Sequence, residues 1–320
     1  MPHRGVSLPE FKMKIKKKKF AVLKNGRSWL AASGAVLTAI GANNARAHGF
    51  EGDYFFPPTI TTDDPFATDE LLLPSVSYFK TPGNPATGIT DFGAGFIKEI
   101  FPKFALGISG DYLYEKPEGQ GQITGWNDFV MSAKYQLWEN APHQAIFSVG
   151  ALWQIGGSGS KQVGADSANI FTPTIYYGKA FGDLPDSLKY AKPFAVTGTL
   201  GEAFPTSGEP NNLAWGFAVE YSLRYLQEQV KDVGLPQPFS RMIPLVEFAM
   251  ISPENRAGGP TTGTINPGVL YENNYFQIGA EATIPVNRAS GANVGAIVQL
   301  QIYIDDIWPK VFGFPIFGHD

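Results

Sequence analysis

The chain has no cysteine among its 320 residues and only four histidines. The first absence excludes disulfides, thiolate metal sites and cysteine nucleophiles. The histidines are scattered, and none lies within a predicted strand beside a serine, as a Ser–His–Asp triad would favour; they are His3, His48, His143 and His319. The sequence therefore predicts no enzyme, no metal site and no cofactor.

Long hydrophobic runs are also missing. The longest, residues 29–40, has about 12 apolar or small residues, whereas a membrane-spanning helix needs roughly 20. It follows a basic stretch at 12–27 and precedes Ala45-Arg46-Ala47, a small-x-small cleavage pattern. These are the three parts of a secretory signal. We therefore expect residues 1–47 to be removed, although an uncleaved anchor is the alternative.

Basic residues become scarce once this segment is set aside. Residues 1–47 hold ten of the 25 Lys and Arg but one of the 29 acidic residues, which leaves 15 bases against 28 acids and a net charge of −13. Nucleic-acid binding needs clustered basic residues on one face. The composition therefore excludes DNA or RNA as a partner.

What the remaining chain does contain is an alternation of apolar with polar or small residues. Alternation at period two marks a strand with one apolar and one polar face, and segments of about ten residues behind an export signal are typical of outer-membrane barrels. A soluble all-β sandwich also alternates, but its strands are usually shorter. The predicted strands are 74–81, 87–98, 104–114, 126–138, 144–156, 168–179, 192–202, 212–226, 241–251, 262–271, 275–286 and 293–305.

The ends of the mature chain do not follow this pattern. Residues 48–73 are broken by Pro57-Pro58 and by acids, so we interpret them as an N-terminal arm, lying in the periplasm or folded into the lumen. Residues 74–305 form the predicted barrel, and 306–320 a C-terminal periplasmic tail that packs at the periplasmic mouth or against the arm. Most connections alternate between short and long, as in outer-membrane barrels. The two exceptions are 180–191 and 227–240, and the latter segment could hold a helical turn.

The inward-facing side chains are mostly small, with eight charged candidates for lining the lumen. These are Asp91, Asp111, Asp128, Lys134, Glu220, Arg224, Glu247 and Glu281. Six acids against two bases would concentrate cations and disfavour anions. Alternatively, salt bridges of Glu220 with Arg224 and of Asp128 with Lys134 would simply hold the wall rigid.

Several stretches at the two ends of the mature chain are similar to those of a known group. They are His48-Gly49-Phe50, residues 61–66, 266–271, 279–288, 304–309 and 313–318. The chain resembles a group of transporter-like bacterial outer-membrane barrels related to the MetA-pathway of phenol degradation proteins. The resemblance implies passage of small aromatic or apolar compounds and assigns no site residues.

The combined expectation is an all-β protein, a closed antiparallel transmembrane β-barrel of about 12 strands in the bacterial outer membrane. We expect a channel or transporter for passive passage of small solutes, either small aromatic or apolar compounds or cations. The alternative is a non-conducting structural or interaction barrel with a plugged lumen. The expected partners are outer-membrane lipid and lipopolysaccharide, the barrel-insertion machinery and a small-molecule solute of unknown identity.

Overall fold

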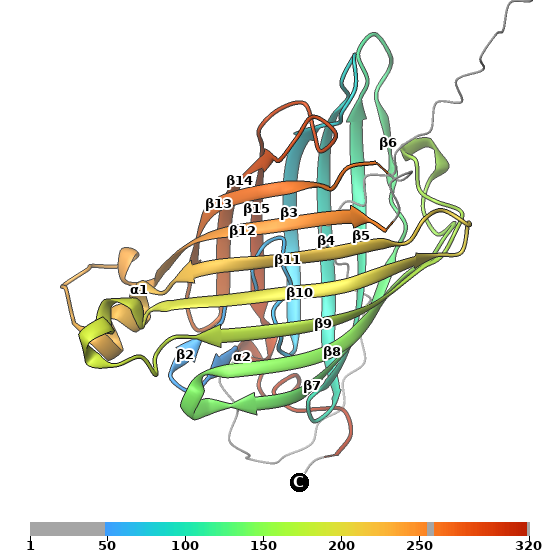
Figure 1. Ribbon diagram of the computed structural model, residues 1–320. Helices are drawn as coiled ribbons and strands as arrows, with labels where there is room; N and C mark the ends of the chain where they lie inside the picture. The colour runs from blue at the N-terminus through green and yellow to red at the C-terminus, as the bar shows by residue number, and fades with distance from the viewer. Residues whose placement is uncertain (1–48, 255–258, 319–320) are drawn as a thin grey trace, which may run out of the picture.

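The computed structural model of the protein describes residues 49–254 and 259–318. The predicted signal at 1–47, His48 and His319 lie outside the described residues. Thirteen strands form one sheet, shown in Figure 1. Their bounds are β3 Glu70–Lys80, β4 Gly88–Phe101, β5 Phe104–Lys116, β6 Ile123–Trp126, β7 Val130–Asn140, β8 Ala145–Gln154, β9 Ile170–Ala180, β10 Phe194–Pro205, β11 Asn212–Tyr221, β12 Met242–Pro253, β13 Thr262–Glu272, β14 Phe276–Pro285 and β15 Gly295–Tyr303.

The sheet closes on itself as an antiparallel barrel. Apart from β6 and β7, each strand pairs with its neighbour in the chain, and β15, the last strand of this sheet, pairs with β3, its first. The second half of β5, residues 112–115, pairs with β6, and its first half, residues 104–109, pairs with β7. The strands β6 and β7 therefore share one position in the wall. The described wall therefore has twelve strand positions, as the sequence predicted. Apart from the short β6, every strand of the described wall is paired on both sides, which is what a wall in lipid requires.

One predicted strand boundary differs because of a proline. The first strand was expected to begin at Pro74, but β3 begins at Glu70. The pairing of β3 with β4 shifts register between Leu72 and Ser75, which marks a bulge. Proline is tolerated at bulges because it has no N–H to give to the ladder. The bulge therefore lets the strand continue through Pro74.

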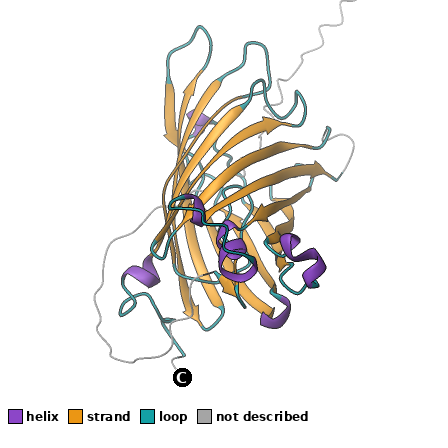
Figure 2. Cartoon of the chain, turned by 90° about the vertical axis from the view of Figure 1, so that its left-hand side faces the viewer, coloured by secondary structure: helices purple, strands orange, loops and turns teal. Residues whose placement is uncertain are grey.

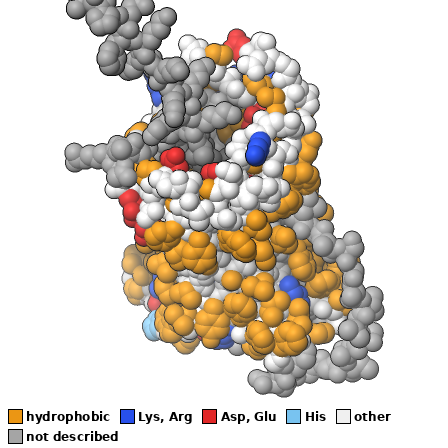
Figure 3. All heavy atoms as spheres, turned by 90° about the vertical axis from the view of Figure 1, so that its right-hand side faces the viewer, with side chains coloured by type: hydrophobic (Ala, Val, Ile, Leu, Met, Phe, Trp, Pro, Cys, Tyr) orange, Lys and Arg blue, Asp and Glu red, His pale blue; other side chains and the backbone are white. Residues whose placement is uncertain are grey.

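The alternation sorts the wall into two faces as predicted. On β7, Met131, Tyr135 and Leu137 are exposed, whereas Lys134 and Gln136 are buried inside. The face seen in Figure 3 carries hydrophobic side chains over its lower half and polar or charged ones round the upper rim. A single-sided apolar wall of this kind suits contact with acyl chains. Other exposed outward-facing side chains include Phe92, Leu106, Ile108, Trp153, Phe171, Ile175, Leu200, Ile278 and Val298.

The end of the barrel at which β4 ends and β5 begins, called the lower end here, carries both long exceptional connections (Figures 1 and 2). The first contains a 3₁₀ helix at Asp186–Ala191. The second contains α1 at Leu223–Tyr225, a π-helical turn at Leu226–Val230 and a 3₁₀ turn at Phe239–Arg241.

The strand predicted over 212–226 is therefore too long, because β11 ends at Tyr221 and the chain turns into α1. The Ser222 hydroxyl accepts a hydrogen bond from the Tyr225 backbone N–H at 3.1 Å, as a helix N-cap does. Similarly, the last predicted strand ends at Tyr303 and is followed by α2, Ile304–Ile307.

The tail, residues 308–318, continues from α2 and lies along the lower end of β4. The backbone N–H groups of Ile316 and Phe317 donate to the carbonyls of Glu99 and Ile100 at 3.2 and 2.9 Å. These carbonyls lie below the last residue pair of β3 with β4. The tail therefore satisfies strand backbone that β3 does not reach.

A buried ion pair holds the tail and the start of β3 together. The Lys98 ammonium pairs with the Asp69 carboxylate and also donates to the Phe314 carbonyl at 2.8 Å and the Phe312 carbonyl at 3.4 Å. The Lys98 and Asp69 side chains are 12% and 1% exposed. One lysine therefore ties the tail to the residue that directly precedes β3.

This pair predicts a dependence of stability on pH. Burial raises the pKa of Asp69 to about 7, although Lys98 opposes the rise. As pH rises from about 4 to about 7, the unfolded chain has released this proton and the folded protein still holds it, so the unfolding free energy falls. We expect Asp69→Asn to remove this part of the dependence in urea unfolding of detergent-solubilised protein. Parallel pH profiles for wild type and variant would contradict it.

No helix among residues 49–254 and 259–318 has the length and apolar content needed to cross a membrane.

Candidate functional site: the lumen and its arm

The N-terminal arm, residues 49–69, passes through the lumen. It begins at the lower end with a two-stranded hairpin of β1 (Phe50–Glu51) and β2 (Tyr54–Phe55). Tyr54 and Phe56 are completely buried, and the Tyr54 hydroxyl donates to the Pro193 carbonyl at 3.1 Å. Of the two predicted positions for this segment, periplasm or lumen, the structure shows the lumen.

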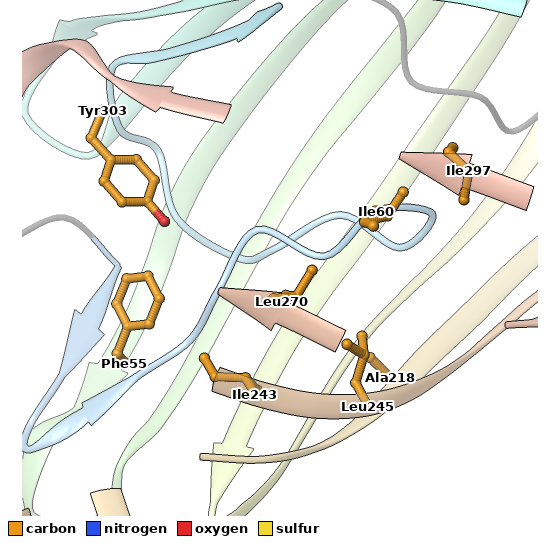
Figure 4. Close-up of a cluster of buried hydrophobic side chains, with 8 residues drawn as sticks. All are labelled: Phe55, Ile60, Ala218, Ile243, Leu245, Leu270, Ile297 and Tyr303. Carbon is orange, nitrogen blue, oxygen red and sulfur yellow. The ribbon is translucent and has the colours of Figure 1, made fainter. Parts of the chain in front are cut away.

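Two apolar clusters hold the arm against two adjoining parts of the wall. Figure 4 shows the first, in which Phe55 and Ile60 pack with inward side chains of β11, β12, β13 and β15. The second joins Tyr54, Phe56 and Phe66 to the wall of β8–β10 and to Tyr225 of α1. Tyr225 falls within the strand predicted over 212–226. It lies inward because the chain turns at Ser222, and its ring centre is 5.3 Å from that of Tyr54. The members of the first cluster are Phe55, Ile60, Ala218, Ile243, Leu245, Leu270, Ile297 and Tyr303.

Glu247 of β12 binds the middle of the arm. Its carboxylate accepts backbone N–H groups from Ile60 at 2.6 Å, Thr61 at 3.0 Å and Thr62 at 2.6 Å, and the Thr61 hydroxyl at 2.6 Å. Glu247 itself is 0% exposed. Hydrogen bonds to a charged acceptor are stronger than those between neutral groups. We call this arrangement the Glu247 latch.

Lys134 of β7 binds the next part of the arm from the opposite wall. Its ammonium lies 3.0 Å from an oxygen of Asp63, 3.7 Å from one of Asp64, and donates to the Asp64 carbonyl at 2.8 Å. The Ser148 hydroxyl donates to the Pro65 carbonyl. The arm is therefore fastened to both walls by polar side chains that the barrel strands supply.

Neither salt bridge expected from the sequence is present. Lys134 pairs with the arm rather than with Asp128, because the arm places Asp63 and Asp64 within reach. Arg224 lies on α1, not on a strand, and pairs with Glu228 and Glu272 rather than with Glu220. Both predictions were wrong because they paired residues along single strands without the elements that fill or cap the barrel.

The remaining charged residues predicted to line the lumen lie in two parts of the wall. Asp91 and Asp111 lie on the neighbouring strands β4 and β5 and are 5% and 7% exposed. Asp128, between β6 and β7, accepts the Gly159 backbone N–H at 2.9 Å and so holds the connection after β8. Glu220 and Glu281, from β11 and β14, are buried on either side of Glu247.

The wall side chains that bind the arm could not be recognised as such from the sequence. Glu247 and Lys134 were singled out as lumen residues, but nothing in their strands indicated what they bind. Within 48–73, the run Thr61-Thr62-Asp63-Asp64 is the available signal, since it offers hydroxyls and carboxylates to a polar lumen. Such a run is equally compatible with a solvated segment, so only the fold could reveal the contacts.

The chemistry of this site is that of hydrogen bonding and ion pairing. Within residues 49–254 and 259–318, no group of three or more His, Asp or Glu side chains is placed to hold a metal ion. The arm is fastened without a covalent bond. Its contacts are therefore reversible, and its main polar ones depend on two wall side chains, Glu247 and Lys134.

No family model matches the sequence, and no curated protein matches it. Among solved structures, an outer-membrane channel from Pseudomonas putida F1 is similar with a TM-score of 0.48 and 11% identity, over 74% of this chain and 95% of that one. The KdgM porin, in complex with disordered oligogalacturonate, gives a TM-score of 0.41 and 12% identity, over 71% and 98%. At such identities the likeness concerns the fold. The resemblance to the phenol-degradation group stays a prediction.

Proposed function

We propose that this protein is an outer-membrane channel for passive passage of small solutes, and that its arm closes the lumen until it is displaced. The observation that carries this proposal is the Glu247 latch. A permanent plug would need only apolar packing, whereas this arm also satisfies a buried carboxylate that faces the lumen. A polar lumen inside an apolar outer wall is the arrangement of a solute path across lipid.

The solute class follows from the wall's charge and from the resemblance noted above. Among the candidate lumen residues six buried acids stand against one buried base, which favours cations over anions; the acids are Asp91, Asp111, Asp128, Glu220, Glu247 and Glu281, and the base is Lys134. The resemblance adds small aromatic or apolar compounds as candidates. We propose further that residues 1–47 direct export and are cleaved, and that the barrel-insertion machinery places the mature chain among outer-membrane lipid and lipopolysaccharide.

Conductance in planar bilayers tests the channel proposal. Mature protein should show rare openings, and protein lacking residues 49–69 should show frequent ones with a preference for cations. Deletion of residues 308–318 provides a control, because it removes a segment near the other end of the chain that lies along β4 rather than in the lumen. Absence of conductance both with and without the arm would refute the channel.

A non-conducting structural barrel is the second candidate. The complete burial of Tyr54 and Phe56 favours it, since apolar packing of this kind resists withdrawal of the arm. Liposome swelling separates the two candidates: a structural barrel excludes small sugars and amines whether or not the arm is present.

A further inference from the structure

Three glutamates of the wall lie around the middle of the arm. Glu220 is paired in the sheet with Leu245, Leu245 with Gly268, and Gly268 with Glu281, so Glu220 and Glu281 lie on one rung three strands apart. At about 4.8 Å between strands, their backbones are about 14 Å apart along the wall. Glu247 lies two residues beyond Leu245 on the same face, between them.

These glutamates differ in the hydrogen-bond donors that their carboxyl oxygens receive. The arm supplies Glu247 with donors, whereas both oxygens of Glu220, which is 1% exposed, have no hydrogen-bond partner. The amide oxygen of Asn266, 0% exposed, also has none, although its amide nitrogen donates to the Thr61 hydroxyl at 3.1 Å. Within the described part of the chain, no Lys or Arg is ion-paired with any of the three glutamates. Buried acceptors without donors are costly.

We propose that this wall binds the ammonium group of a small organic cation, which competes with the arm for Glu247. The inference rests on the proposed channel function and names its solute class. The arm offers Glu247 three backbone N–H groups, and a primary ammonium carries the same number of donors. The ammonium also brings a positive charge, which the arm's backbone lacks. Glu220 and the Asn266 amide oxygen are free to accept from it.

Other ligand classes fit this wall less well. Anions are disfavoured by the acid-rich wall and by the Glu247 carboxylate at its centre. The described residues contain no cluster suited to a metal ion. A quaternary ammonium has the charge but no N–H, so it cannot replace the hydrogen bonds that the arm gives up.

Binding of the cation and opening of the channel are then linked. Residues 60–62 and the ammonium both require the Glu247 carboxylate, so the cation binds only the form from which the arm is displaced. A ligand that binds one of two forms shifts the equilibrium toward that form. An ammonium compound therefore opens the channel through which it passes.

Planar-bilayer recordings of the full mature protein test this, with ethylammonium and tetramethylammonium chloride at equal concentration as probes. Ethylammonium is expected to raise the open probability at least about tenfold, and tetramethylammonium to leave it near its value in sodium chloride. Glu220→Gln should weaken the apparent affinity for ethylammonium about tenfold, the effect of losing one hydrogen bond to a charged group. Glu228→Gln removes an exposed carboxylate that pairs with Arg224 outside the wall strands, and should respond as wild type.

The outcomes separate this inference from the channel proposal. Equal responses to the two cations, or a wild-type response of Glu220→Gln, would overturn the ammonium site while the channel stands. If Glu220→Gln does not fold, Glu281→Gln provides the second test with the same expectation. Loss of all conductance in full-length Glu247→Ala protein would instead refute the channel.

Discussion

Glu247→Ala is expected to raise the open probability of the channel about 10³-fold. The substitution removes the acceptor of three backbone N–H groups and one hydroxyl from the arm. Hydrogen bonds to charged groups contribute about 1.5–3 kcal/mol each. They are not additive, and relief of repulsion between Glu247 and its acidic neighbours in the buried, closed state offsets part of the loss. A net loss of about 4 kcal/mol in arm docking corresponds to the stated factor.

Open probability in planar bilayers measures this effect. Two further variants provide an intermediate case and a control. Glu247→Gln keeps one carbonyl acceptor, so its open probability should lie between those of wild type and Glu247→Ala. Thr197→Val is the matched control, because the Thr197 hydroxyl is also buried in the lumen wall but makes no hydrogen bond. The latch is refuted if Glu247→Ala gates like Thr197→Val.

A disulfide introduced by Thr62→Cys together with Gly216→Cys is expected to abolish conductance. The Thr62 hydroxyl oxygen lies 3.1 Å from the position that a Cβ atom on Gly216 of β11 would occupy, which is within the separation that a disulfide spans once the Phe248 carbonyl oxygen, 2.7 Å away, shifts slightly. The chain has no other cysteine, so only one intramolecular disulfide can form. A covalent link between arm and wall prevents the arm from leaving, whatever the strength of the latch.

Reduction makes this experiment internally controlled. Openings should be absent from the oxidised protein and return when dithiothreitol is added to the same bilayer. Each single-cysteine variant should conduct under both conditions. Undiminished conductance of the oxidised double variant, with the disulfide verified by mass spectrometry, would mean that the solute path does not require displacement of the arm.

The Glu247→Ala substitution can be combined with this disulfide. If the arm is the gate, the disulfide should silence the channel even when the latch is missing. If conductance of Glu247→Ala protein survives oxidation, the open path created by that substitution does not depend on arm movement.

The barrel wall could be predicted from the sequence because alternation is a local property. Side chains at i and i+2 of a strand share a face whatever lies across from them. Lys134, Glu220 and Glu281 could therefore be assigned to the inside from their own strands. Where the local pattern was ambiguous the prediction failed, as at Ser222, where a helix cap replaces the expected strand.

The position of the arm, in contrast, could not be predicted from a local pattern. Residues 49–69 have no periodicity, and their position in the lumen depends on contacts with residues more than 180 positions away, as between Ile60 and Glu247. Contacts between distant segments also determine which residues the charged candidates pair with. Lys134 pairs with Asp63 instead of Asp128, because a buried charge pairs with the opposite charge that the fold brings near it.

The sequence by itself determined the number of strands, the two faces of the wall and the excess of acids on the inner one, since each is fixed by neighbours within one strand or by composition. Only the tertiary structure decided that the arm enters the lumen, that Glu247 holds it and that Glu220 is left without a donor. Those results depend on which distant segments meet once the cylinder has closed, and no short-range pattern carries that information.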